Sequence, residues 1–184
     1  MDSDGYLSQL ADIFNGITVN TPSISAIIAI ALAGVLLLAS GFASASEIAF
    51  FSLSPSDRND IDERNHPSDD KISALLGDTE RLLATILITN NFVNVTIIML
   101  CNFFFMNVFV FHSPLAEFLI LTVILTFLLL LFGEIMPKIY SAQKTLAFCR
   151  FSAPGIYFLE KVFRPIATVL VRSTTFLNKH FVKK

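Results

Sequence analysis

Polar side chains recur at helical spacing inside two of the apolar stretches of this chain. Ser40 and Ser44 are four residues apart in the first stretch, and Asn90 and Asn94 are four residues apart in the second. Residues at this spacing share one face of a helix. Their hydroxyl and amide oxygens are hard ligands, which suit Mg²⁺, Ca²⁺ or Na⁺ better than Zn²⁺ or copper.

The third apolar stretch ends in a carboxylate and a proline. Proline lacks the backbone N–H and obstructs the carbonyl four residues back, so Pro137 is predicted to leave the carbonyl of Gly133 without an intrahelical partner. Glu134 is an ionisable group at membrane depth, where such groups are costly and functional by default. The alternative is an ion pair between Glu134 and Lys138, four residues on.

Each of these polar residues also has a purely structural interpretation. An amide inside a span commonly bonds a neighbouring helix, which is worth about 0.6 kcal/mol, and for Asn90 or Asn94 alone this explanation weighs as much as an ion site. Ser40 and Ser44, taken singly, suit close packing or a bond to the carbonyl four residues back. Glu47 suits an interfacial carboxylate. Only the combination favours a cation site.

The apolar stretches that carry these residues are long enough to cross a bilayer. Hydrophobic residues make up 54% of the chain and charged residues 15%, whereas soluble domains carry about 25% charged residues. No charged residue lies between Asp12 and Glu47 or between Arg81 and Glu117. Each gap exceeds the roughly 20 apolar residues that span a membrane, which excludes a soluble globule. We predict an all-α membrane protein with three spans, at about residues 22–51, 82–105 and 115–137.

The segments between and after the spans predict shorter helices. Ser54-Pro55 is a helix start, and residues 54–80 predict two short cytoplasmic helices. Residues 139–178 mix basic and apolar residues, which favours juxtamembrane amphipathic helices. We expect Pro154-Gly155 and Pro165 to interrupt them. A fourth, imperfect span over residues 156–178 is the alternative.

The basic residues predict the orientation. All thirteen Lys and Arg lie from Arg58 onward, in two blocks that flank apolar segments. A nucleic-acid binder would gather them in one stripe, so we expect no such partner. Basic loops stay in the cytoplasm, which places residues 138–184 inside and residues 1–21 and the turn at His112 outside. The two cysteines, Cys101 and Cys149, are predicted to be buried thiols.

The alternating direction of the spans brings the polar residues to one depth. Ser44 lies about seven residues before the inner end of the first span, and Asn90 about eight residues after the inner start of the second. Gly133 lies near the inner end of the third. We therefore predict an ion site between the three helices, in the inner half of the bilayer.

Three ordered motifs resemble those of the CNNM/CorC family of magnesium transporters. Phe42–Ser54 (FASASEIAFFSLS) resembles the first-span signature of that family, Leu87–Asn94 (LITNNFVN) the second, and Phe132–Lys138 (FGEIMPK) the third. The chain departs from the family at Ala45, where a Gly is usual. The long, Phe-rich spans also resemble the gliding-motility-associated branch of the family.

The resemblance implies both a fold and a function. The fold would be a homodimer in the bacterial inner membrane, with residues 22–178 as its membrane domain and residues 179–184 starting a linker to cytoplasmic CBS domains. The function would be Mg²⁺ export coupled to Na⁺, with a dehydrated Mg²⁺ between the spans. The implied ligands are Ser44, Asn90, Glu134 and the carbonyl of Gly133, with the carbonyl of Val93, Ser40 and Asn94 as further candidates.

Two other functions compete with transport. A membrane scaffold associated with gliding motility would keep the fold and use the polar cluster for packing. An intramembrane enzyme is disfavoured, because His66, His112 and His180 all fall outside the spans and no paired carboxylates are present. We therefore do not expect an enzyme, and Mg²⁺ binding that needs Glu134 would separate transporter from scaffold.

Overall fold

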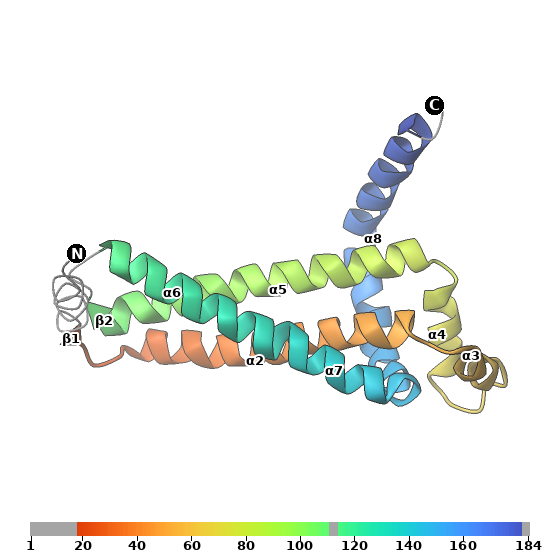
Figure 1. The fold of residues 1–184 in the computed structure, drawn as a ribbon, viewed down its shortest axis with the longest axis horizontal. Coiled ribbons are helices and arrows are strands. Elements are labelled where there is room, and N and C mark those ends of the chain that lie inside the picture. The colour runs from red at the N-terminus through yellow and green to blue at the C-terminus, as the bar shows by residue number, and fades with distance from the viewer. Residues whose placement is uncertain (1–17, 111–113, 182–184) are drawn as a thin grey trace, which may run out of the picture.

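The computed structural model describes residues 18–110 and 114–181, and within them the chain is all-α apart from one pair of two-residue strands (Figure 1). The predicted outer location of residues 1–17 and of His112 falls outside these ranges. The elements in chain order are β1 (Thr18–Val19), α2 (Ile24–Phe51), α3 (Pro55–Asp62), α4 (Asp69–Leu76), α5 (Thr79–Val108), β2 (Phe109–Val110), α6 (Pro114–Leu128), the π-helix η1 (Leu129–Ile135), α7 (Met136–Gln143) and α8 (Thr145–Phe181).

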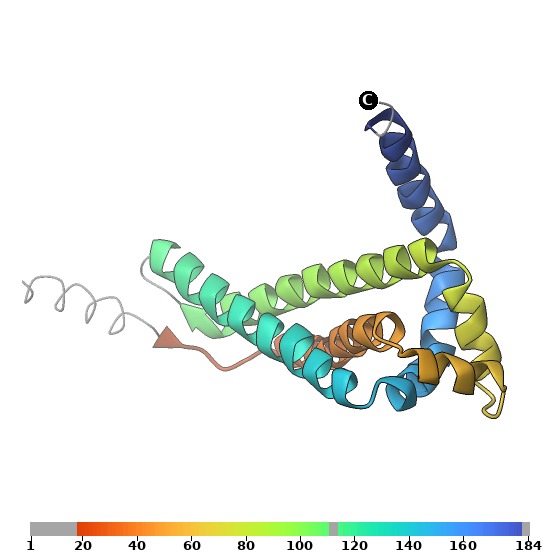
Figure 2. The same ribbon diagram turned by 45° about the vertical axis from the view of Figure 1, so that its right-hand side comes forward.

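Three long apolar helices form the body of the molecule. Among the described residues, Ile24–Phe51, Thr79–Val108 and Glu117–Gln143 are long and apolar enough to cross a membrane, which confirms the predicted three spans. The third span is built from α6, η1 and α7 in succession. α2 packs along α5 and against η1 and α7, so it lies between the other two spans (Figures 1 and 2).

Side-chain caps and strand pairing determine where the spans begin and end. Ser23 caps α2 by accepting a hydrogen bond from the N–H of Ala26. Asp78 caps α5 by accepting from the N–H of Arg81, so this helix starts earlier than predicted. At the other end, Phe109 leaves the helix to pair with Val19 of β1. The two strands tie the N-terminal end of α2 to the C-terminal end of α5.

The third span changes its helical register in front of the proline. Across η1 the backbone bonds reach five residues back, as in the bond from the N–H of Met136 to the carbonyl of Leu131. Such π segments are rare and are frequent at functional sites. In this register the residue opposite the missing N–H of Pro137 is Phe132, not Gly133.

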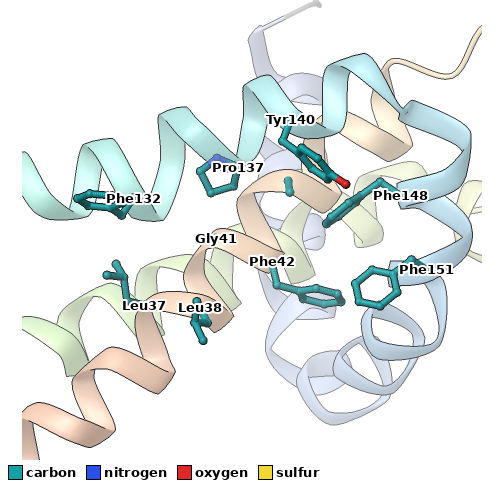
Figure 3. Close-up of a pocket in the computed structure, with 10 residues that line it drawn as sticks. Leu37, Leu38, Gly41, Phe42, Phe132, Pro137, Tyr140, Phe148 and Phe151 are labelled. Atoms are coloured by element: carbon teal, nitrogen blue, oxygen red, sulfur yellow. The ribbon is translucent and has the colours of Figure 1, made fainter.

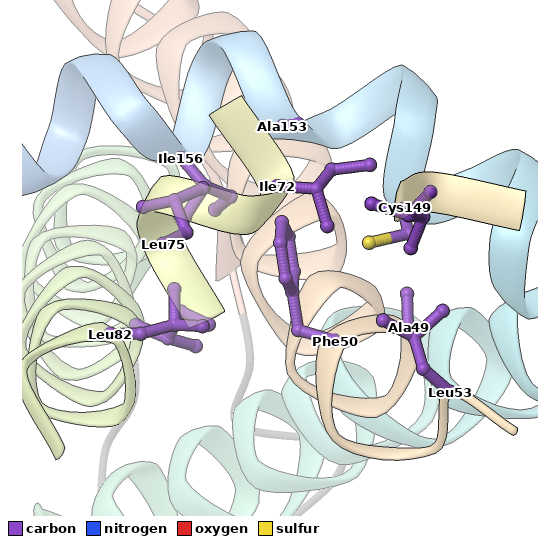
Figure 4. Packing of buried hydrophobic residues seen from close by; sticks show 11 residues of the cluster. Ala49, Phe50, Leu53, Ile72, Leu75, Leu82, Cys149, Ala153 and Ile156 are labelled. Atoms are coloured by element: carbon purple, nitrogen blue, oxygen red, sulfur yellow. The ribbon is translucent and has the colours of Figure 1, made fainter. Parts of the chain in front are cut away.

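A second core joins the short helices α3 and α4 to the adjoining ends of α2 and α5 and to α8. Ser54 and Asp57 form a reciprocal capping box at the start of α3, as the Ser54-Pro55 pattern predicted. The core side chains come from α2, α3, α4, α5 and α8 and from Leu53 between α2 and α3, with Phe50 enclosed at the centre (Figure 4). The largest of its fully buried members are Phe50, Ile61, Ile72, Leu75, Leu82, Ile86 and Ile156. The two predicted short helices are thus confirmed as a packed layer.

The expected interruption of the last helical segment is wrong. α8 continues through Pro154 and Pro165. Each proline removes one intrahelical hydrogen bond, and both prolines lie at exposed positions, where their rings displace no packed neighbour. α8 is not among the helices apolar enough to span a membrane. This composition favours the surface-lying alternative for residues 156–178.

Candidate functional site

One serine hydroxyl connects the first two spans. Ser40 Oγ lies 2.8 Å from Asn90 Oδ1 and 2.7 Å from Asn94 Oδ1. Ser44 Oγ lies 3.4 Å from the same oxygen of Asn90. Both serines are fully buried and both amides are partly buried. The structure therefore brings four of the predicted site residues into one cluster, with the secondary candidates Ser40 and Asn94 making its shortest contact.

The Ser40 hydroxyl faces two amide oxygens of the second span. It has one proton but lies within hydrogen-bond distance of both oxygens. With the amides in this orientation, one of the two oxygen pairs has no proton between its members at any moment. Oxygen lone pairs gathered in a partly buried cluster form a favourable environment for a hard cation.

The third span approaches this cluster through a glycine. A Cβ added at Gly133 would lie 3.2 Å from Ser40 Oγ and 3.5 Å from Leu37 Cδ1, so no side chain separates η1 from α2 here. At Gly41, the residue after Ser40, an added Cβ would lie 3.0 Å from Pro137 Cγ and 3.4 Å from the carbonyl oxygen of Phe132. The three spans therefore meet in space, around Ser40.

The predicted ion pair between Glu134 and Lys138 is not formed. Lys138 Nζ instead lies 3.0 Å from Glu47 Oε2, which gives the interfacial carboxylate of Glu47 its partner. Glu134 is half-buried, and within residues 18–110 and 114–181 it has neither an ion pair nor a side-chain hydrogen bond. A half-buried carboxylate without a protein cation remains available to an external one.

The remaining candidates sit on α5. The side chain of Val93 is buried in an apolar cluster with Ala33 and Ile97, so only its backbone carbonyl is a candidate ligand. One turn toward the N-terminus of α5, Thr89 Oγ1 donates to the carbonyl of Thr85 at 2.8 Å. The hydroxyl of Thr85 is fully buried and has no partner among the described residues.

Sequence reasoning missed Thr85 and the carbonyl of Phe132. The four-residue spacing that selected the asparagines also links Thr85 to Thr89, so a signal for Thr85 was present. The Phe132 carbonyl depends on the π register, for which the sequence contains no comparable signal.

Residues 30–183 match the CNNM family, described as the Cyclin M transmembrane N-terminal domain. The chain belongs to this family. The match covers most of the chain and includes all three motifs, so the resemblance found in the motifs is confirmed for the membrane domain. The gliding-motility-associated branch stays a prediction.

Two curated relatives of this CNNM domain are UPF0053 proteins. The protein from Haemophilus influenzae is 29% identical over 136 residues, which cover 74% of this chain and 31% of the relative. The protein from Synechocystis sp. is 26% identical over 140 residues, which cover 76% of this chain and 39% of the relative. The chain thus spans less than half the length of these relatives.

Proposed function

We propose that this CNNM membrane domain transports a divalent cation, Mg²⁺, and holds it between α2, α5 and η1. The observation that supports the proposal is the buried cluster of Ser40, Asn90 and Asn94, which meets Gly133 without an intervening side chain. Coupling to Na⁺ and the outward direction belong to the same proposal. They rest on the family resemblance.

The proposed ligands divide by chemistry. Ser44 and Asn90 supply neutral side-chain oxygens, Gly133 supplies its carbonyl, and Glu134 supplies the negative charge. The alternates are Ser40, Asn94 and the carbonyls of Val93 and Phe132. Desolvating an ion costs several kcal/mol even after relaxation, so a divalent cation among neutral oxygens alone would be poorly held. Mg²⁺ keeps several waters in most protein sites, and the serine hydroxyls can orient them.

Mg²⁺-dependent melting of the purified chain tests this assignment. A ligand that binds only the folded state stabilises it by RT ln(1 + [L]/Kd), about 2.7 kcal/mol at a hundredfold excess over Kd. Glu134→Gln and Asn90→Ala are expected to abolish this shift, because each removes an oxygen or charge that nothing else replaces. Ser44→Ala is expected to weaken it, since the backbone carbonyl remains.

Two substitutions outside the cluster serve as controls. Asn107→Ala removes an amide whose Nδ2 donates to the carbonyl of Phe103 in its own helix, and Glu117→Gln removes a carboxylate near the start of the third span. Both variants should keep the full Mg²⁺ shift. Loss of the shift in either control would point to a general effect on the fold rather than on a site.

The scaffold function predicts a different result. With the Asn94 amide turned, its Nδ2 would donate to Ser40 Oγ and complete a purely structural network, and such amide orientations are assigned from hydrogen bonding. If Glu134→Gln retains the whole Mg²⁺ shift, or if the unsubstituted chain shows none, the cluster serves packing and the scaffold function replaces transport.

A further inference from the structure

We propose that a groove between α2, the third span and α8 binds one anionic phospholipid of the cytoplasmic leaflet, with an acyl chain in the groove and the phosphate at Lys144. The proposal requires that the three spans lie in a bilayer. It does not depend on which ion the chain carries, or on whether it carries one.

The groove is an open apolar hollow at the surface of the bundle, lined by α2, the third span and α8. It encloses about 410 Å³ (Figure 3). Leu38 and Phe42 of α2 line one wall, Phe132 of η1 and Pro137 of α7 line another, and Phe151 of α8 closes the end. Every one of these side chains is apolar, so the groove suits a hydrocarbon chain.

An aromatic cluster gives the groove a fixed shape. The ring centroids of Phe42 and Phe151 are 6.1 Å apart, and those of Phe148 and Phe151 are 5.8 Å apart. Tyr140 stands edge-on to Phe148 at 6.4 Å. Rings at these separations attract one another beyond simple burial. The hollow is therefore held open by contacts between its own walls rather than by its occupant.

A cation marks one end of the groove. A second hollow of about 260 Å³ shares Tyr140, Phe148 and Phe151 with the first, and Lys144 lines it as well. The neighbouring cations are already neutralised, Lys138 by Glu47 and Arg150 by Asp69. Lys144 is exposed and forms no ion pair with any residue of the described segments. Its ammonium is free to bind an anion.

The position of Lys144 favours a lipid, rather than a second protein surface, as the occupant of the groove. Lys144 follows α7, at the predicted cytoplasmic end of the third span, where phospholipid phosphates lie. Covering the groove with an apolar helix of another subunit would bury this unpaired ammonium, which costs several kcal/mol. A lipid phosphate places an anion there instead, while its acyl chain fills the apolar part.

The groove and the ion cluster share one wall. Gly41 follows Ser40 in α2. It lines the groove and lies close to Pro137. Ser40 in turn approaches Gly133. An acyl chain in the groove would therefore pack against the same contact between α2 and the third span that closes the cluster.

Fluorescence quenching provides a direct test because the chain contains no Trp. Phe151→Trp places a single reporter in the groove, and Leu38→Trp places a second one on the opposite wall in a separate variant. Each is reconstituted in bilayers with brominated phosphatidylglycerol or brominated phosphatidylcholine. We expect a relative binding constant of about fivefold in favour of phosphatidylglycerol at both reporters, the effect of one basic residue near an anionic surface.

Matched variants assign the preference to the groove and to Lys144. Adding Lys144→Gln should reduce the preference to about onefold, whereas Lys161→Gln, which removes an ammonium over the ring of Tyr157, should leave it intact. Val123→Trp, on an exposed part of α6, should show no preference. Equal quenching by both lipids at the groove reporters would overturn the proposal. So would the absence of quenching by either lipid, because a protein surface would then cover the groove.

Discussion

The hydroxyl of Ser40 is the point at which the three spans come together. Helical spacing in the sequence selected the correct faces of α2 and α5, because a four-residue period fixes which side chains are neighbours on one helix. It did not determine how far each helix slides along the other. That offset made Ser40 and Asn94, rather than Ser44 and Asn90 alone, the centre of the cluster. Which of these oxygens bind an ion stays a prediction.

Gly133 is expected to tolerate no side chain. Gly133→Ala would put a methyl group 3.2 Å from Ser40 Oγ, so either η1 moves away from α2 or the hydroxyl turns out of the cluster. Overpacking of this kind costs about 1–3 kcal/mol. The free energy of unfolding in a detergent titration should fall by that amount, and Mg²⁺-dependent stabilisation should fall with it.

A glycine elsewhere in the same bundle is the control for this substitution. A Cβ at Gly34 meets nothing within 4 Å, so Gly34→Ala should be neutral or stabilise the helix by up to about 1 kcal/mol. Combining Gly133→Ala with Ser40→Ala removes the closest clashing atom and should recover part of the lost stability. If Gly133→Ala is as harmless as Gly34→Ala, the close approach of η1 and α2 is refuted.

Local signals predicted the elements to different degrees. The cap at Ser54 is a chemical feature of the sequence, and it predicted the start of α3. The start of the second span was predicted from hydropathy at residue 82, and the cap at Asp78 places the start of α5 three residues earlier. The prolines of α8 led to a wrong prediction of helix breaks. Proline removes one hydrogen bond, but α8 is continuous through Pro154 and Pro165, which are both exposed. η1 packs against α2, and its π register was not predictable from the segment alone.

The attachment of α4 to α8 depends on a buried ion pair. Arg150 Nε lies 2.8 Å from Asp69 Oδ1, Arg150 Nη2 lies 3.0 Å from Oδ2, and the N–H of His66 also donates to Oδ2. Burial by itself raises the pKa of Asp69, but these bonds and the charge of Arg150 outweigh it and hold the pKa below the usual value. The folded state therefore binds this proton less readily than the unfolded state does.

The pair should make stability depend on pH in the acid range. Because the folded pKa of Asp69 is lowered, its contribution is complete above the unfolded value of about 3.9. It is lost as the pH falls through the folded pKa. Asp69→Asn should remove this part of the pH dependence and, by leaving Arg150 unpaired, cost about 3–5 kcal/mol at pH 7. Urea or detergent titrations at pH 7 and below pH 4 measure both effects.

The adjacent surface pair is the matched control. Arg64 and Asp70 lie 3.4 Å apart, but their side chains are 70% and 72% exposed. Asp70→Asn should therefore change stability by less than about 1 kcal/mol. Equal effects of Asp69→Asn and Asp70→Asn would show that burial does not strengthen the first pair.

At the scale of the whole molecule, hydropathy predicted the number of membrane spans but not how they pack against one another. Three spans were predictable because a bilayer selects about 20 consecutive apolar residues, a signal that survives local irregularities. The position of α2 between the other two spans was not predictable. All three spans are apolar on most sides, so no local pattern indicates which spans are neighbours. Large apolar side chains remain exposed along every span, as expected of lipid-facing helices. The homodimer of the family stays a proposal.

The orientation in the membrane leads to a labelling experiment that the native thiols do not disturb. Cys101 is buried in α5, and Cys149 is fully buried in α8, where burial and the nearby charge of Asp69 raise its pKa to about 12. Thiolates are the reactive form, so the unsubstituted chain should stay unlabelled by an impermeant maleimide. Val19→Cys, exposed in β1, should react in sealed cells because the basic blocks place that end outside. Asn65→Cys, exposed between α3 and α4, should react only after the membrane is opened, and the reverse pattern would invert the topology.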